Sequence, residues 1–205
     1  MKKIIVSLFC TLLLWTNYSL AAHIFTAEEV RLITDDANTG NPKAQHLLGR
    51  LYSNGQIKGE FQGEGIFQNL TEAKNWFEKA AIQGSSKSQT ELGTMYLRGL
   101  GVKQNHKKGE DWLRKAALQG DELALLSLGN MYYFGKGVDK DYALAKSFYE
   151  EAINKSNSSD GLFFLAVMYT TGKGVPKDLK KAKELAARSC VGGSQLGCNA
   201  FEKLN

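Results

Sequence analysis

The sequence predicts an all-α fold, a right-handed α/α solenoid of about four helix-pair repeats with a capping helix at each end. The first observation is a recurring segment, Leu-Gly-x-Met-Tyr followed by Gly-x-Gly-Val, whose second position falls at Gly93, Gly129 and Ala166. The offsets are 36 and 37 residues, and self-similarity at such a period is typical of stacked helical repeats. The second observation is that each period holds two segments with apolar or small residues at helical spacing.

The first 21 residues are predicted to be a signal peptide that does not belong to the fold. Two lysines precede an apolar run from Ile4 to Trp15, and a small-x-small cleavage site follows it. We expect cleavage after Ala21 or Ala22. The apolar run is shorter than the roughly 20 residues that a membrane-spanning helix needs. The mature chain is therefore expected in the periplasm or outside the cell, with no membrane insertion after signal cleavage.

The charge balance argues against a nucleic-acid partner. The full sequence has 26 basic and 21 acidic residues, a net charge of +5, and losing the two lysines of the signal peptide lowers this to +3. Nucleic-acid-binding proteins usually gather Lys and Arg on one stripe, whereas here the basic residues are spread over the polar faces of the predicted helices. These charges are interpreted as solvated surface.

The mature chain is expected to begin with an isolated helix. Thr26 and Glu29 fit a capping box, and the helix is predicted to run to about Gly40. Its end precedes Gly49 by the same nine residues that separate Gly84 from Gly93, so it resembles the second helix of a missing repeat and would cap the array. The predicted segments are 22–43 for the N-terminal cap, 44–84, 85–120, 121–156 and 157–193 for the four repeats, and 194–205 for a C-terminal capping helix.

Two recurring features have local explanations. A glycine inside the first helix of each repeat costs about 1 kcal/mol against Ala, and its recurrence indicates a close approach of two helices. The Gly-x-Gly-Val loops do not fit a phosphate-binding loop, which follows a strand, so their glycines are expected to end helices and form turns. The second helices are predicted to begin at residues whose side chains cap backbone N–H groups. These residues are Asn69, Asn105, Asp141 and Asp178.

Inside each second helix a large side chain stands beside small ones. Trp76 is followed by Ala80 and Ala81, and Trp112 is followed by Ala116 and Ala117, while Phe148 takes the corresponding place in the third repeat. We expect these large side chains to fill the core.

These residues together resemble the Sel1-like repeat family. The second repeat nearly spells the family pattern, from Leu92 through Trp112 to Ala117. The resemblance covers residues 26–205. Two departures are an eight-residue insertion around Gln56–Gln62 in the first repeat, and Ser189-Cys190 in place of Ala-Ala in the fourth.

The predicted mature chain keeps two cysteines, Cys190 and Cys198. In an exported protein such a pair favours a disulfide, and a helical hairpin can bring the two Cα atoms close enough. Two reduced core cysteines remain the alternative, while the spacing excludes a Cys-x-x-Cys redox site. The seven-residue spacing is similar to that of cysteine-rich Sel1-like proteins, and this resemblance implies a bridge between neighbouring helices.

The expected function is binding of another protein on the concave face of the array. No catalytic group stands out, and we expect a monomer without cofactor or metal. Helix periodicity places a line of residues on this face that becomes apolar in the last two repeats. A tighter superhelix that buries them is the alternative. The predicted partner-binding residues are Arg98, Leu126, Asn130, Phe134, Phe163, Phe164, Val167 and Thr171.

The family resemblance implies two kinds of partner and one rival function. Exported Sel1-like proteins act as envelope adaptors, and some short ones resemble periplasmic immunity proteins that neutralise secreted phospholipase or toxin effectors. Cysteine-rich relatives are linked instead to β-lactam binding or hydrolysis. This sequence lacks Ser-x-x-Lys with its companion motifs and a His-based zinc set, so a binding protein is the favoured interpretation over an enzyme.

Overall fold

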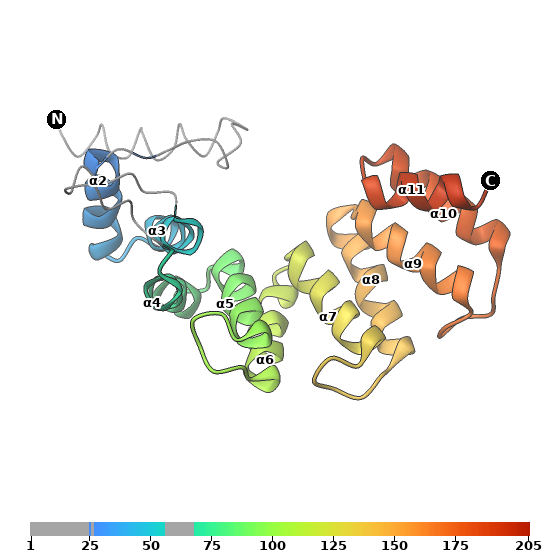
Figure 1. Ribbon diagram of the computed structural model, residues 1–205, viewed down its shortest axis with the longest axis horizontal. Coiled ribbons are helices and arrows are strands. Elements are labelled where there is room, and N and C mark those ends of the chain that lie inside the picture. The colour runs from blue at the N-terminus through green and yellow to red at the C-terminus, as the bar shows by residue number, and fades with distance from the viewer. Residues whose placement is uncertain (1–24, 26, 56–67) are drawn as a thin grey trace. The chain divides into compact units, whose positions relative to one another are not determined.

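The computed structural model describes residues 25, 27–55 and 68–205, and the regular elements within them are ten α-helices. The all-α repeat class is thereby confirmed. The expectations for the signal peptide, for the cap Thr26 and for the insertion at Gln56–Gln62 lie outside the described residues. The chain divides into two compact units (Figure 1). The first ends at Met95 and also includes Gly99–Lys103, and the second comprises Tyr96–Arg98 and Gln104–Asn205.

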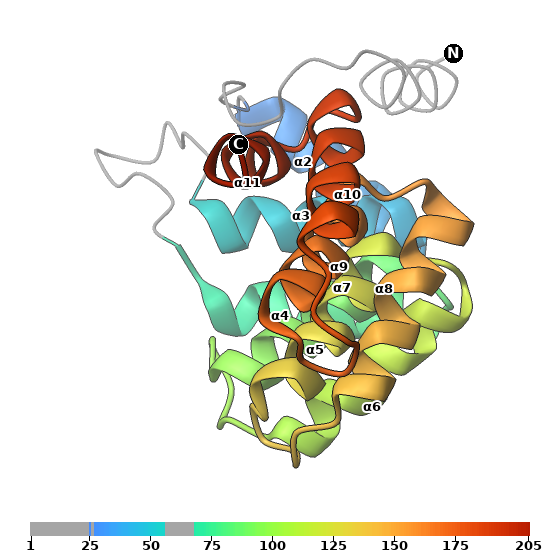
Figure 2. The same cartoon turned by 90° about the vertical axis from the view of Figure 1, so that its right-hand side faces the viewer.

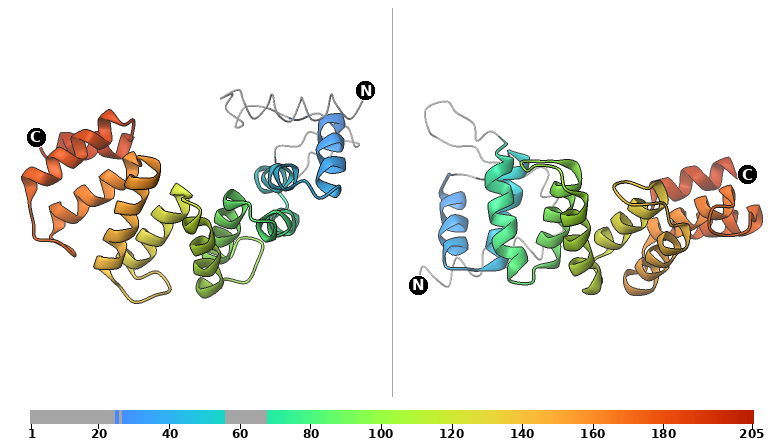
Figure 3. Two further views of the ribbon diagram at one scale, coloured as in Figure 1. Left: turned by 180° about the vertical axis from the view of Figure 1, so that it is seen from behind. Right: turned by 90° about the horizontal axis from the view of Figure 1, so that it is seen from below.

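The first unit is built on α3, which packs against α2 on one side and α4 on the other (Figure 3). Its helices are α2 (Ala27–Asn38), α3 (Pro42–Asn54), α4 (Leu70–Ile82) and most of α5 (Ser86–Arg98). The helices α2, α3 and α4 share a core that consists of Phe25, Ile33, Ala37, Ala44, Leu48, Leu51 and Trp76. The helix α2 thus covers one flank of α3, as expected of a terminal capping helix.

The second unit is a run of helices in which each packs against the next (Figure 1). They are α6 (His106–Leu118), α7 (Glu122–Phe134), α8 (Tyr142–Ser156), α9 (Ser159–Thr171), α10 (Leu179–Val191) and α11 (Gln195–Lys203). The two helices of one repeat, α7 with α8 and α9 with α10, make the most extensive contacts. The short α11 lies beside α10 (Figure 2) and also touches α9.

The predicted N-caps of the second helices are confirmed in all four repeats. The side-chain oxygens of Asn69, Asn105, Asp141 and Asp178 accept backbone N–H groups three residues later at 2.9–3.0 Å. Each bond satisfies one donor that the first helical turn leaves free. The first helices have their own caps, which the sequence analysis did not identify: Asn41, Ser85, Asp121 and Ser158.

The Gly-x-Gly-Val loops are joints between repeats. Their first glycine ends a helix in the left-handed conformation, as at Gly135, which confirms the predicted C-cap. Their second glycine lies against the first residue of the second helix in the preceding repeat. A Cβ atom on that glycine would come within 2.6 Å of Leu70 for Gly101, 2.1 Å of His106 for Gly137 and 2.6 Å of Tyr142 for Gly174.

The helix-interior glycines allow a close helix approach, as predicted, and an aromatic ring of the second helix packs on two of them. A Cβ atom on Gly49 would lie 2.7 Å from the ring of Phe77, and one on Gly129 would lie 2.4 Å from Tyr149. These rings follow Trp76 and Phe148 by one residue. Trp76 and Phe148 are themselves 8% exposed and belong to the core, as predicted, so α4 and α8 each bury two adjacent large side chains.

Trp112 departs furthest from the predicted core. It is only partly buried, and the ammonium group of Lys115 lies 4.1 Å from its ring centroid. Leu113 is the large apolar side chain that this helix buries fully, and it stands one position after the motif aromatic.

The predicted disulfide between Cys190 and Cys198 is confirmed, and it links the end of α10 to α11. The alternative of two reduced cysteines is excluded. Beside the bridge, the buried hydroxyl of Ser189 donates a hydrogen bond to the Ser159 carbonyl at 2.6 Å. A Cβ atom on Gly197 would lie 2.2 Å from that hydroxyl oxygen. The Ser189 hydroxyl bond and the Cys190 bridge are the contacts that replace Ala-Ala in this repeat, and Gly197 lets α11 lie close to α10.

Candidate interaction surface

Seven of the eight predicted partner-binding residues lie on two helices, α7 and α9, and the eighth, Arg98, lies on α5. Phe134 is 50% exposed at the end of α7, and Phe163, Phe164 and Val167 are partly exposed on α9. Leu126 is only 6% exposed and belongs to the core, so the burial alternative holds for this residue. We define the α7–α9 surface by the remaining six residues: Asn130, Phe134, Phe163, Phe164, Val167 and Thr171.

Arg98 is the predicted residue that the structure does not bring to this surface. It is exposed at the end of α5. In the described part of the chain, no hydrogen bond, ion pair or ring contact joins it to the α7–α9 surface. Arg98 stays a predicted partner-binding residue that is separate from the α7–α9 surface.

Tyr149 of α8 connects two residues of the α7–α9 surface, Asn130 of α7 and Phe164 of α9. Its hydroxyl donates a hydrogen bond of 2.9 Å to the Asn130 side-chain oxygen. Its ring stacks on Phe164 with centroids 4.9 Å apart, and Phe164 in turn contacts Phe163. Burial raises the pKa of the Tyr149 hydroxyl, with a smaller contribution from Tyr133, so the hydroxyl stays protonated and remains a donor.

Tyr133 of α7 connects two further residues of this surface, Phe134 of α7 and Thr171 of α9. Its ring makes edge contacts with Phe134 at 4.9 Å and with Tyr142 at 5.4 Å between centroids. Its hydroxyl lies 3.4 Å from the hydroxyl of Thr171 on α9. The sequence analysis missed both Tyr133 and Tyr149. The available signals were the aromatic run that ends α7 and the adjacent aromatic pair Phe148-Tyr149 in the second helix of the repeat.

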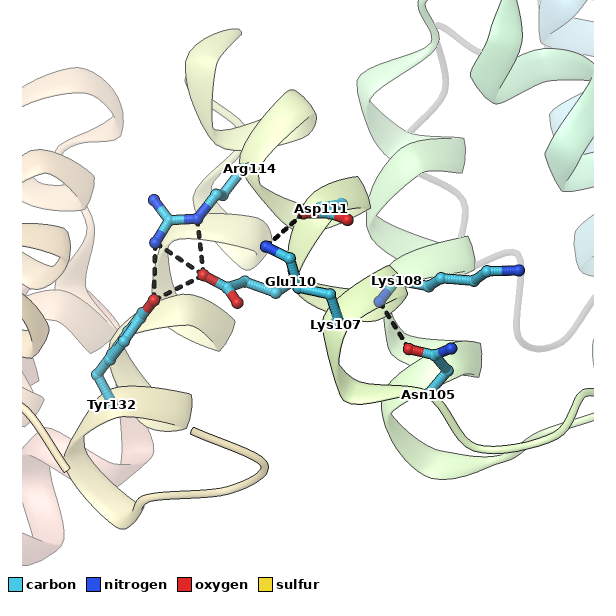
Figure 4. Close-up of polar contacts among 7 residues, drawn as sticks. All are labelled: Asn105, Lys107, Lys108, Glu110, Asp111, Arg114 and Tyr132. Carbon is cyan, nitrogen blue, oxygen red and sulfur yellow. Dashed lines mark hydrogen bonds and ion pairs between the residues drawn. The ribbon is translucent and has the colours of Figure 1, made fainter. Parts of the chain in front are cut away.

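A polar network fixes α7 on the preceding helix α6 (Figure 4). The carboxylate of Glu110, a residue that is 6% exposed, accepts hydrogen bonds from Arg114 Nε at 2.8 Å and from the Tyr132 hydroxyl at 2.6 Å. Arg114 Nη2 also donates to the Tyr132 oxygen at 2.7 Å, which closes the triangle. The ring of Tyr132 stacks on Phe148 of α8. The network and this ring contact therefore tie together α6, α7 and α8.

The ionisation of Glu110 is set by opposing influences. Burial raises the pKa of its carboxyl. The hydrogen bonds from Tyr132 and Arg114 and the charges of Arg114 and Lys107 lower this pKa by more than burial raises it, so the net shift is downward. The charged carboxylate is thus the form that the folded chain prefers. Burial and the hydrogen bond to Glu110 raise the pKa of Tyr132, which keeps its hydroxyl protonated.

Replacing Glu110 by Gln is expected to lower the free energy of unfolding at neutral pH by about 1–2 kcal/mol, because buried hydrogen bonds to a charged group are lost. The lowered pKa means that the carboxylate stabilises the fold fully above its unfolded pKa of about 4.3 and loses this effect as the pH falls through the folded value. The difference between wild type and variant should therefore shrink toward about pH 3. Urea unfolding followed by circular dichroism measures it.

The matched control is Asp111→Asn on the same helix. Asp111 pairs with Lys107 at 3.0 Å, and both side chains are largely exposed, so this change should cost less than about 0.5 kcal/mol. An equal loss in the two variants, or a Glu110→Gln effect that does not depend on pH, would contradict the role given to the network.

Other features of the described residues add no second site. They contain no group of three or more His, Cys, Asp or Glu side chains that could hold a metal ion. None of their helices has both the length and the apolar content that crossing a bilayer requires. A shallow hollow of about 280 Å³ lies between α8, α9 and α10, with Leu162, Leu165 and Leu185 among its lining residues. None of the residues that line this hollow belongs to the α7–α9 surface.

A profile of the Sel1 repeat matches residues 42–85, 86–121, 123–157 and 159–193. The chain belongs to the Sel1 repeat family. The matched segments cover most of the described helices and all four of the predicted repeats. Sel1 repeats are helix pairs that form protein-interaction scaffolds, and this chain is a scaffold protein of that class.

Several solved structures are similar to this Sel1 repeat protein. One is c5321 from Escherichia coli, described as a protective antigen with an SLR fold, at 30% identity and a TM-score of 0.74 over 86% of this chain and 36% of that one. Another is a Sel1 repeat protein from Oxalobacter formigenes, at 28% identity and a TM-score of 0.73 over 86% of this chain and 67% of that one. The present chain thus spans about a third of the length of the Escherichia coli protein. No curated protein matches the sequence.

Proposed function

We propose that this Sel1 repeat protein is an exported, non-enzymatic protein that binds another protein through its α7–α9 surface. The partner is an envelope protein, in which case the chain is an adaptor, or a secreted phospholipase or toxin effector, in which case it is an immunity protein. The mature chain acts as a monomer and needs no cofactor.

The exposed aromatic side chain of Phe134 is the observation that carries the proposal. It is 50% exposed, and it stands at the edge of a surface whose other apolar members, Phe163, Phe164 and Val167, are partly exposed. Aromatic residues are enriched among the side chains that dominate protein–protein binding. The two tyrosines beneath the surface hold these rings in place before a partner arrives, which reduces the entropy lost on binding.

The disulfide supports the exported location. Disulfides form and persist in the periplasm and outside the cell, whereas the cytosol keeps thiols reduced. The bridge between Cys190 and Cys198 therefore favours the compartment that the proposed signal peptide of residues 1–21 also implies.

The proposal is tested by capturing partners with the mature chain from an envelope extract and from culture supernatant, then measuring the affinity of each captured protein in purified form. Phe163→Asp and Phe134→Asp should each weaken binding by at least about tenfold, because a charge replaces an apolar contact at the interface. The matched control is Leu196→Asp on α11, where the native side chain is 48% exposed.

The outcome separates the possibilities. A partner that both Phe variants lose and the control retains supports the α7–α9 surface, and its identity as an effector or an envelope protein decides between immunity protein and adaptor. Retention of every partner by both Phe variants overturns the surface.

A further inference from the structure

We propose that the partner presents an acidic polypeptide segment, which binds a lysine–aromatic cluster at the edge of the α7–α9 surface. We define this cluster as Tyr133, Phe134, Tyr142, Lys136 and Lys173. The inference rests on the proposed function, since it names the chemistry of the protein that the surface binds.

The geometry of the cluster brings two repeats together. The rings of Phe134, Tyr133 and Tyr142 form a continuous set of edge contacts, at 4.9 and 5.4 Å between centroids. The Lys136 ammonium lies 5.5 Å from the Phe134 centroid. The Lys173 ammonium comes from the next repeat and lies 5.4 Å from Tyr133 and 5.9 Å from Tyr142. Both positive charges are therefore held over one group of three rings.

The joint between the repeats explains why Lys173 lies there. Gly174 packs directly against Tyr142 at the start of α8. The preceding residue, Lys173, therefore lies close to the Tyr142 side chain. Lys136 occupies the same position in the loop of the preceding repeat, one residue before Gly137. The two lysines are thus placed by the repeat itself, at equivalent positions along the array.

Neither lysine is used by the fold as an ion-pair partner. Within the described residues, no ion pair or side-chain hydrogen bond involves Lys136 or Lys173, and both are exposed. The nearby carboxylates of Asp141 and Asp178 are engaged as helix caps. Lys140 and Lys177 differ from them in position, because these two residues lie against the glycines that end α7 and α9.

An acidic protein segment fits this arrangement better than an anionic membrane does. Membrane binding by a basic surface is strongest where apolar side chains project into the bilayer beyond the charges. Here Tyr133 is buried, and the ammonium groups lie over the rings. An extended segment can instead place carboxylates on the two lysines and an apolar side chain against Phe134. Charge complementarity of this kind contributes both partner choice and association rate.

The test is a selection of random short peptides displayed on phage against the full mature chain, followed by affinity measurements with the selected peptides. Selected sequences should be enriched in Asp and Glu relative to the starting library. The double variant Lys136→Glu/Lys173→Glu should bind them at least about tenfold more weakly. The control Lys203→Glu, on exposed α11, should stay within about twofold of wild type. If the melting temperature of this double variant is lower than that of wild type, the double variant Lys136→Gln/Lys173→Gln is used in its place.

The possible results are distinct. Selected peptides without acidic enrichment, or acidic peptides that the double variant binds as well as wild type, overturn the acidic segment. If these peptides are lost with Phe163→Asp, the proposed function still stands. Lysine-dependent sedimentation with phosphatidylglycerol vesicles, but not with phosphatidylcholine vesicles, in the absence of acidic peptide binding would assign the cluster to a membrane and overturn the proposal.

Discussion

Replacing Gly101 by Ala is expected to lower the free energy of unfolding by about 3 kcal/mol, combining left-handed backbone strain with overpacking. Gly101 has a φ of +66°, and an added Cβ atom would lie 2.6 Å from the carbonyl carbon and oxygen of Leu70. These are backbone atoms of the first residue of α4, so a side-chain rotation cannot relieve the overlap. Urea unfolding of the mature chain, followed by circular dichroism, measures the loss.

The control for this prediction is Gly84→Ala in the same unit. Gly84 also has a positive φ, of +93°, but no atom lies within 4 Å of the position its Cβ would take. Only the backbone strain should remain, about 1–2 kcal/mol. Equal losses in the two variants would show that the contact with Leu70 contributes nothing.

Removal of the disulfide is expected to cost about 2.5 kcal/mol. The bridge joins residues separated by eight positions, and the chain-entropy relation gives about this value for a loop of that length. The double variant Cys190→Ser/Cys198→Ser should therefore unfold at lower urea concentration than the oxidised wild type. Reduced wild type should match the variant.

The loss should appear first in α11, because this short helix is held by the bridge and by its contacts with α10 and α9. Amide hydrogen exchange should rise in α11 before it rises in α7 or α8. A reductant that also destabilises the double variant, or uniform exchange across the second unit, would contradict this assignment.

The elements that sequence reasoning predicted well are those determined by local rules. The repeat period gave the fold class. A side-chain oxygen at the start of a helix, as at Asn105, and a glycine at its end, as at Gly135, act within a few residues of the chain. The Cys190–Cys198 pair is equally local. Each of these can be recognised without knowing how one helix is rotated against another.

The elements that it missed depend on helix rotation. Trp76 and Phe148 are buried in the core as expected, but Phe77 and Tyr149, one position later, are the rings that pack on the glycines of the partner helices, and Trp112 is only partly buried. A one-residue shift turns a side chain by about 100°, and the motif does not determine which of two adjacent large residues faces the partner helix. The same uncertainty placed buried Leu126 on the predicted surface and left out Tyr133.

The helix α7 shows why its face could not be assigned. Apolar side chains surround most of it, with Leu125, Leu126 and Leu128 all buried. Periodicity identifies a buried face only where a polar face opposes it. Which residues of α7 reach the surface therefore depends on the packing of α8 and α9, which only the three-dimensional structure reveals.

The joint formed by the second glycine of each loop has a consequence for the history of the chain. The residue on which that glycine rests is Leu70, His106 or Tyr142 in the three copies, so the same joint accepts side chains of very different shape. Gene duplication could then add or delete whole units without requiring matched substitutions in their neighbours. Surfaces such as that of α7 and α9 would remain free to diversify.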